Sequence, residues 1–221
     1  MTTPTAPRPY VSAIRAAGAS EKRRRVLEAA TELLRLDANV SSFSLEAVAR
    51  ASGVTRLTVY NQFGSRRGLL EAVFDTIAER GGLPELLKAA ASPDPRRALD
   101  TIIEIFIDFW SGDPAIGRLH DAMASDLEFA HALTQRNERR RKLLNAVVKR
   151  LVDDTASLRE RRDVVDVMYA CTSYAMFRML DVNRTPAAIC AVVKQICKDA
   201  LAHCVAAHRL AGVEGRKRSS R

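Results

Sequence analysis

The chain has 221 residues, of which 47% are apolar, and its formal net charge is +9. This length and apolar content are enough for one compound domain or two small ones. No apolar run is long enough to cross a bilayer, and the first twenty residues lack the hydrophobic stretch of a signal peptide. We therefore expect a cytoplasmic protein with no membrane partner.

Basic side chains are concentrated toward the two ends of the chain, with five basic residues and one acidic residue among residues 209–221. Clustered Lys and Arg favour a polyanion as partner, because they release condensed counterions from phosphates. A tail that only improves solubility remains the alternative for residues 209–221.

Four cysteines occur without a C-x-x-C pair: Cys171, Cys190, Cys197 and Cys204. They have no recognisable metal spacing with the four histidines, so we expect neither a metal site nor a cofactor. The last three recur every seven residues and would form one stripe on a helix. This stripe favours small apolar residues that face a core or a partner helix. A thiol sensor or an intersubunit disulfide remains the alternative.

Apolar residues recur with helical spacing along nearly the whole chain, and no period-two segment is long enough for a strand. The predicted fold class is therefore all-α. Residues 1–19, rich in Pro, Thr and Ala, are expected to form a disordered arm. Four helices are expected to begin near Ser20, Ser44, Thr55 and Ser65. The first is expected to end between Asp37 and Ser42, and the fourth at Gly81–Gly82.

Three later helix starts are marked by a polar cap followed by proline: Asp94–Pro95, Asp113–Pro114 and Thr185–Pro186. The expected helices cover about residues 94–111, 113–124, 126–153, 159–181 and 186–208. The last two are apolar over much of their circumference, so we expect them to pair with a second copy in a four-helix bundle and form a homodimer.

Two short helices with a tight turn between them occupy residues 44–63 in this prediction. Such a motif needs a small residue where the helices cross, a glycine in the turn and an apolar anchor on the second helix. Ala49, Gly53 and Val59 supply all three. The second helix would present a polar set suited to base edges and phosphates: Thr55, Arg56, Leu57, Thr58, Tyr60 and Asn61.

The segment SLEAVARASGVTRLTVYNQFGSRRGLL resembles the DNA-binding domain of the TetR family of transcriptional regulators. The resemblance covers about residues 22–75. It implies an N-terminal three-helix helix-turn-helix domain over residues 20–80 and a C-terminal helical ligand-binding and dimerisation domain over residues 83–208. Residues 209–221 would follow as a basic disordered tail.

The resemblance also implies roles for individual residues on a double-stranded DNA operator. Ser44 would cap the second helix near a phosphate, and Thr55, Arg56, Leu57 and Thr58 would face the groove. Tyr60 and Asn61 would reach the backbone or the bases, and Arg66 would take the place of a phosphate-gripping lysine of the family.

Two residues depart from the family pattern at the start of the fourth helix. The family often has an acidic residue and a helix former where this chain has Arg67 and Gly68. We expect Arg67 to raise general DNA affinity and Gly68 to weaken the helix by about 1 kcal/mol. Earlier in the chain, Arg8, Arg15 and the run Lys22–Arg25 would add phosphate or minor-groove contacts. For the run Lys22–Arg25, a solvated helix start is the alternative.

Aromatic and thioether side chains in the second half are candidates to line a site for a small-molecule effector. They are Phe106, Trp110, His120, Met123, Tyr169, Tyr174 and Phe177. Each of them, taken alone, is also explained by core or interface packing.

The chain lacks the motifs G-x-S-x-G, H-E-x-x-H, G-x-G-x-x-G and the Walker loop, so we expect no catalytic residues and no enzyme. The resemblance predicts a ligand-responsive, sequence-specific regulator, a repressor that a small apolar molecule releases from its operator. The alternative is a helical ligand-binding or redox-sensing protein that no longer binds an operator.

Overall fold

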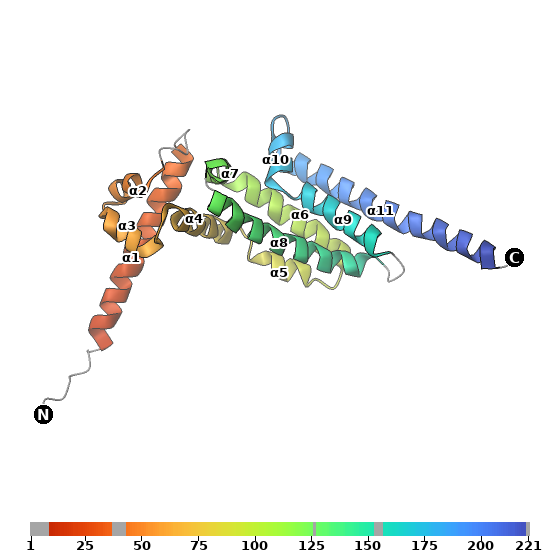
Figure 1. Ribbon diagram of the computed structural model, residues 1–221, viewed down its shortest axis with the longest axis horizontal. Helices are drawn as coiled ribbons and strands as arrows, with labels where there is room; N and C mark the ends of the chain where they lie inside the picture. Colours follow the sequence, from red (N-terminus) through yellow and green to blue (C-terminus); the bar gives the residue numbers. More distant parts are fainter. Residues whose placement is uncertain (1–8, 37–42, 126, 153–156, 220–221) are drawn as a thin grey trace, which may run out of the picture. The chain divides into compact units, whose positions relative to one another are not determined.

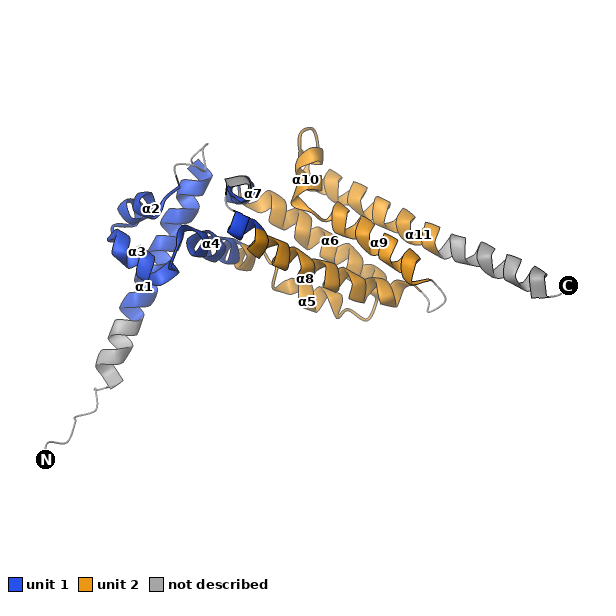
Figure 2. Ribbon diagram, viewed as in Figure 1, with its two compact units in different colours: residues 1–77, 114–130 blue, residues 78–113, 131–221 orange. Residues whose placement is uncertain are grey.

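A computed structural model describes residues 9–36, 43–125, 127–152 and 157–219, with side chains for residues 17–36, 43–123, 127–152 and 157–204. Every regular element in these ranges is an α-helix, which confirms the all-α prediction (Figure 1). The chain divides into two compact units. One holds residues 1–77 and 114–130, and the other holds residues 78–113 and 131–221 (Figure 2).

The first unit is built from four N-terminal helices and one helix from later in the chain. Its helices are α1 (Pro9–Leu36), α2 (Leu45–Ser52), α3 (Arg56–Phe63), most of α4 (Arg66–Arg80) and α7 (Ala115–Ser125). Helix α1 packs against both α2 and α7. The completely or almost completely buried side chains of this unit include Val26, Ala30, Val48, Val59, Leu69 and Leu119. This core fixes the position of α3.

The second unit contains the remaining helices. These are α5 (Glu85–Ala90), α6 (Pro95–Gly112), most of α8 (Leu127–Leu151), α9 (Leu158–Cys171), α10 (Tyr174–Asp181) and α11 (Pro186–Ser219). Helix α11 packs against α6 and α9, and α5 packs against α6. Buried side chains from several helices form its core, among them Ile102, Phe109, Leu144, Met168 and Ile189.

All three predicted proline-marked helix starts are observed. Asp94 accepts hydrogen bonds from the amides of Arg96 at 2.8 Å and Arg97 at 3.3 Å, and α6 begins at Pro95. Helix α7 begins directly after Pro114, and α11 begins at Pro186 with a bond from the Ala188 amide to the Thr185 hydroxyl. Helix α5, by contrast, has no counterpart in the sequence prediction.

Both expected disordered ends differ from the structure. Helix α1 begins at Pro9 rather than near Ser20, and α11 continues through residues 209–219. Residues 10–19 contain four alanines, the best helix former, and no proline follows Pro186 to stop α11. Parts of the expected arm, of the expected end of the first helix and of the expected tail lie outside the described residues. These parts are residues 1–8, 37–42 and 220–221.

The predicted single helix over residues 159–181 is two helices, α9 and α10, with a break at Thr172 and Ser173. The Ser173 hydroxyl accepts a bond from the Met176 amide at 3.2 Å and so caps α10. The Thr172 carbonyl is instead bonded by two side chains from other helices, Trp110 Nε1 at 3.0 Å and Arg140 at 2.9 Å. Side chains from other helices therefore donate to a carbonyl that would accept a backbone amide in an unbroken helix.

Within the described ranges, no helix combines the length and the apolarity that a membrane-spanning segment requires.

Candidate functional site

The turn between α2 and α3 has the geometry that the sequence predicts. The Ser44 hydroxyl accepts a bond from the Ala47 amide at 3.1 Å, which caps α2. Gly53 ends that helix with φ +66°, a left-handed conformation that glycine adopts without strain. The Val54 amide bonds back to the Ala49 carbonyl at 3.0 Å, and Val59 of α3 is fully buried. The turn is thus closed by local bonds and anchored by one apolar side chain.

Helix α3 presents the predicted polar set to solvent. Thr55, Arg56, Leu57, Tyr60 and Asn61 are exposed, and Thr58 is half-buried. The exposed fraction is 66% for Leu57 and 54% for Tyr60, although both are large side chains with apolar surface. The Thr55 hydroxyl caps the helix through the Thr58 amide at 3.1 Å and also bonds the Thr58 hydroxyl at 2.9 Å. The cap and the buried Val59 hold the helix backbone, and so the positions from which these side chains project, in a fixed arrangement.

Arg66 lies at the start of α4, where the resemblance places a phosphate-gripping lysine. Its Nε donates to the Phe43 carbonyl at 3.0 Å, and its guanidinium lies 5.9 Å from the Phe43 ring. Arg66 is half-buried. Part of its hydrogen-bonding capacity therefore joins the start of α4 to the segment before α2.

Arg67 is engaged by two carboxylates of the same unit. Its guanidinium lies 2.8 Å from Glu128 and 3.5 Å from Glu71. These pairs offset the positive charge that the sequence suggests for DNA. All three side chains keep substantial exposure, so the pairs themselves contribute little to stability.

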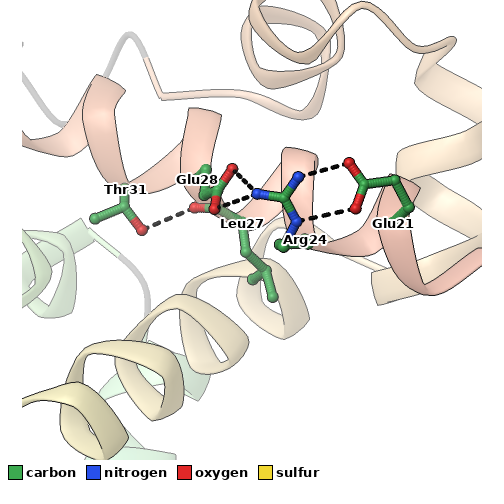
Figure 3. A network of polar contacts seen from close by, with 5 residues as sticks. All are labelled: Glu21, Arg24, Leu27, Glu28 and Thr31. Carbon is green, nitrogen blue, oxygen red and sulfur yellow. Dashed lines mark hydrogen bonds and ion pairs between the residues drawn. The ribbon is translucent and has the colours of Figure 1, made fainter.

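The run Lys22–Arg25 on α1 divides into two bonded and two outward-facing cations. Arg24 binds Glu21 at 2.6 Å and Glu28 at 2.7 Å (Figure 3). The Arg24 hydrogen bond lowers the pKa of the Glu21 carboxyl, and the two carboxylates raise the pKa of Arg24. Arg23 donates to the Gln62 carbonyl at 3.2 Å and lies 4.4 Å from the Phe63 ring.

Arg23 thus binds the end of α3 in this structure, whereas the sequence suggests that it contacts phosphates. Lys22 and Arg25 are exposed, and no described carboxylate forms an ion pair with either. Of the remaining arm candidates, Arg8 and the Arg15 side chain lie outside the described residues.

Known proteins share this helix-turn-helix segment. Residues 26–73 match the family described as bacterial regulatory proteins, tetR family. The HTH-type transcriptional regulator AlkX of Mycobacterium tuberculosis is 43% identical over 82 residues, which are 36% of this chain and 38% of that protein. The sequence likeness to TetR-family regulators is thus confined to the helix-turn-helix segment, and the match spans little more than a third of the relative's length. Both matches are described as regulatory proteins, as the sequence resemblance implies.

Solved TetR-like structures extend the likeness to the whole fold. A TetR-like transcriptional regulator from Rhodococcus sp. RHA1 is 18% identical with a TM-score of 0.61 over 82% of this chain and 96% of that one. NalD of Pseudomonas aeruginosa, the secondary repressor of the MexAB-OprM multidrug efflux pump, is 20% identical with a TM-score of 0.62 over 83% and 97%. At this identity the likeness concerns the fold alone.

Four of the seven effector-site candidates form a row of aromatic rings in the second unit. The ring centroids of Phe106 and Trp110 are 6.2 Å apart, those of Trp110 and Tyr174 are 5.6 Å apart, and those of Tyr174 and Phe177 are 6.3 Å apart. Phe106, Trp110 and Phe177 are buried. A fifth candidate, Tyr169, is half-buried beside two arginines. His120 and Met123 lie on α7 of the other unit and are not part of this row.

Arg140 of α8 joins this group, although the sequence reading passed over it. Its guanidinium lies 4.5 Å from the Tyr169 ring and 5.6 Å from the Phe106 ring. Burial lowers the pKa of Arg140, and the phenol of Tyr169 opposes this shift. A signal was present in the sequence, since Arg140 falls on the same helical stripe as Leu133 and Leu144, seven residues before it and four after.

A cavity of about 530 Å³ lies between α8 and α9 in the second unit. Five basic side chains line it: Arg141, Lys142, Lys149, Arg161 and Arg162. Glu138 and Asp166 are its carboxylates, and both pair with Arg141. Leu158 and Val165 add apolar surface. This volume is in the range of small-molecule sites, and the lining favours an anion.

The cysteine stripe faces the core of the second unit, as its spacing favours. Cys171, Cys197 and Cys204 are buried, and Cys190 is half-buried. All four are free thiols. The hydrogen bond with Cys171, together with burial, raises the pKa of the Cys197 thiol. Among the described residues, no group of His, Cys, Asp and Glu has the arrangement of a metal site.

Proposed function

We propose that this protein is a sequence-specific DNA-binding transcriptional regulator, a repressor that a small molecule with an apolar body releases from its operator. The observation that carries the proposal is the outward face of α3, where Leu57 and Tyr60 are 66% and 54% exposed on a helix fixed at both ends. A large exposed leucine and tyrosine with no packing role are accounted for by contacts with thymine methyl groups and phosphates.

In this proposal the residues of the α3 face have separate tasks. Arg56 and Asn61 offer donors for base edges, and Leu57 offers an apolar contact. Tyr60 and Arg66 would reach phosphates. The hydroxyls of Ser44 and Thr55 already cap their helices, so they would position the two helix N-termini toward phosphates.

The regulator would act as a homodimer through the last helices of the second unit. Exposed apolar side chains lie on α9 (Val167), on α10 (Met179) and directly after α10 (Val182), with exposed fractions of 36%, 68% and 76%. A second copy would cover them in a four-helix bundle. Two α3 helices spaced about 34–36 Å apart would then read successive major grooves, and a ligand that changes this spacing would release DNA. Such a regulator would act in the cytoplasm.

The experiment that tests the proposal is fluorescence anisotropy with labelled DNA from upstream of the protein's own gene. The full-length protein is titrated at several salt concentrations, with and without scrambled competitor DNA. We expect binding that resists competitor, with an affinity that falls steeply with salt. If scrambled competitor DNA displaces the labelled DNA as well as unlabelled specific DNA does, the proposal is contradicted. That result would favour the alternative, a helical ligand-binding or redox-sensing protein that no longer reads an operator.

A further inference from the structure

Arg140 is a buried cation inside an otherwise apolar stripe of α8. Its exposed fraction is 7%, and the neighbouring positions of the stripe, Leu133, Leu144 and Val147, are exposed by 4% or less. A guanidinium in such a position loses most of its hydration, and proteins normally compensate this loss with a carboxylate. The adjacent Arg141 has such compensation, because it pairs with Asp166 and Glu138.

Arg140 lacks this compensation within the described part of the chain. One terminal nitrogen donates to the Thr172 carbonyl at 2.9 Å, and the guanidinium lies against the rings of Tyr169 and Phe106. Hydrogen bonding to the Tyr169 phenol offsets part of the burial cost. Its Nε is buried without any hydrogen-bond partner. No described Asp or Glu forms an ion pair with it. A donor that is charged, buried and unpartnered is unfavourable unless an acceptor arrives.

Arg140 is not the only donor that the fold provides for the Thr172 carbonyl. The Thr172 carbonyl, which Arg140 binds, already accepts a hydrogen bond from Trp110 Nε1 at 3.0 Å. A buried ionic group can often be replaced by an apolar residue of similar volume without loss of stability. An apolar residue at position 140 would continue the stripe of α8. Packing alone therefore does not explain the positive charge of Arg140.

We propose that the effector is an organic acid whose carboxylate pairs with Arg140 and whose apolar body lies along Phe106 and Trp110. The inference rests on the proposed function and deepens it by naming the chemical class of the effector. The carboxylate would accept a bond from the free Nε and supply the missing negative charge. Charge-assisted bonds of this type are the strong ones in proteins.

The cavity between α8 and α9 provides a route for such an acid. Arg141 lines this cavity and lies 4.1 Å from the Tyr169 ring, while Arg140 lies 4.5 Å from the same ring. Tyr169 therefore contacts one arginine at the cavity and one in the interior. The excess of basic side chains around the cavity would draw an anion toward Tyr169, and displacement of its ring would open the way to Arg140.

Calorimetric binding to the full-length protein without DNA tests the inference. The probes are 4-phenylbutyrate and octanoate, each compared with its matched alcohol, 4-phenylbutan-1-ol and octan-1-ol. We expect each acid that binds to bind roughly ten- to a hundredfold more tightly than its alcohol. Because DNA is absent, this result is independent of operator binding.

Three variants assign the preference to one side chain. Arg140→Met keeps a flexible, unbranched side chain and removes the charge, so acid and alcohol should bind alike. Arg140→Lys keeps a charge and should retain part of the preference. Arg139→Met removes an exposed arginine next to it and should bind as the unaltered protein does. Circular dichroism and a thermal melt confirm that each variant folds.

The outcomes separate the inference from the proposed function. Equal binding of acids and alcohols to the unaltered protein, or an acid preference that survives Arg140→Met, overturns the inference even if operator DNA binds. An acid preference that Arg140→Met abolishes supports it, even if the anisotropy experiment finds no operator.

Discussion

The Cα of Gly68 faces the carbonyl oxygen of Phe63 so closely that a Cβ at position 68 would overlap this oxygen and lie 3.3 Å from the carbonyl carbon. Phe63 ends α3 and Gly68 lies in the first turn of α4. The close approach is backbone against backbone, so a side-chain rotation cannot relieve it. The glycine that the sequence suggested as a local weakness is a steric requirement of the α3–α4 junction.

Gly68→Ala is therefore expected to destabilise the first unit, although alanine is the better helix former. Overpacking of this kind costs about 1–3 kcal/mol, more than the roughly 1 kcal/mol that helix propensity returns. Urea denaturation followed by circular dichroism measures the change. Because α3 would shift, DNA binding should weaken as well.

Gly18→Ala is the matched control, since Gly18 also lies in a helix and nothing lies within 4 Å of a Cβ built there. This change should leave stability unaltered or raise it by up to about 1 kcal/mol. Equal stability of the Gly68→Ala and Gly18→Ala proteins would contradict the assigned contact.

The parts of the fold that follow from local chemistry were predictable from sequence. Ser44 and Asp94 act as helix caps within their own segments, and Gly53 has the positive φ that its place in the turn suggests. The exposed set on α3 follows from the same short segment. The family resemblance adds the order of these helices and the expected roles of their side chains.

The parts that sequence reasoning missed depend on contacts between distant segments. The break at Thr172 depends on Trp110 and Arg140, which approach its carbonyl from other helices. Arg67 appeared available for DNA because Glu128, its partner, is far away in the chain. Arg140 was passed over because it lies in a run of charges, ERRRK, that reads as a solvated face.

Arg56→Ala is expected to weaken binding to operator DNA and also to relax base preference, whereas Tyr60→Ala should weaken binding to every sequence alike. A lost base contact costs about 1–3 kcal/mol of discrimination. Anisotropy with operator and scrambled DNA measures both effects. Equal losses on the two DNAs for Arg56→Ala would count against its assignment.

Arg67→Ala serves as the comparison for Arg56→Ala, because both change one exposed arginine near the same helix. Its charge is already offset by Glu71 and Glu128, so its removal should change DNA affinity and the salt slope little. A salt slope reduced by about one unit would show that Arg67 leaves its carboxylates to bind phosphate.

Trp110 and Arg140 share one acceptor, the buried carbonyl of Thr172. Trp110→Phe and Arg140→Met each leave this oxygen with one donor, whereas the double variant leaves it with neither. A buried acceptor without a partner costs about 1–3 kcal/mol. The loss of unfolding free energy in the double variant should therefore exceed the sum of the losses in the two single variants. Urea denaturation of the unaltered protein, the two single variants and the double variant completes this double-mutant cycle. Strict additivity of the two changes would contradict the shared acceptor.

The thiol of Cys197 should react slowly with iodoacetamide in the folded protein. It is completely buried, and both its burial and its hydrogen bond with Cys171 raise its pKa, so little thiolate forms near neutral pH. Half-buried Cys190 on the same helix is the internal control and should be labelled first, although burial raises its pKa too. Mass spectrometry of labelled peptides gives both rates, and in guanidinium chloride the two should become alike. Rapid labelling of Cys197 in the native protein would contradict the structural assignment and favour a redox-sensing role for the cysteine stripe.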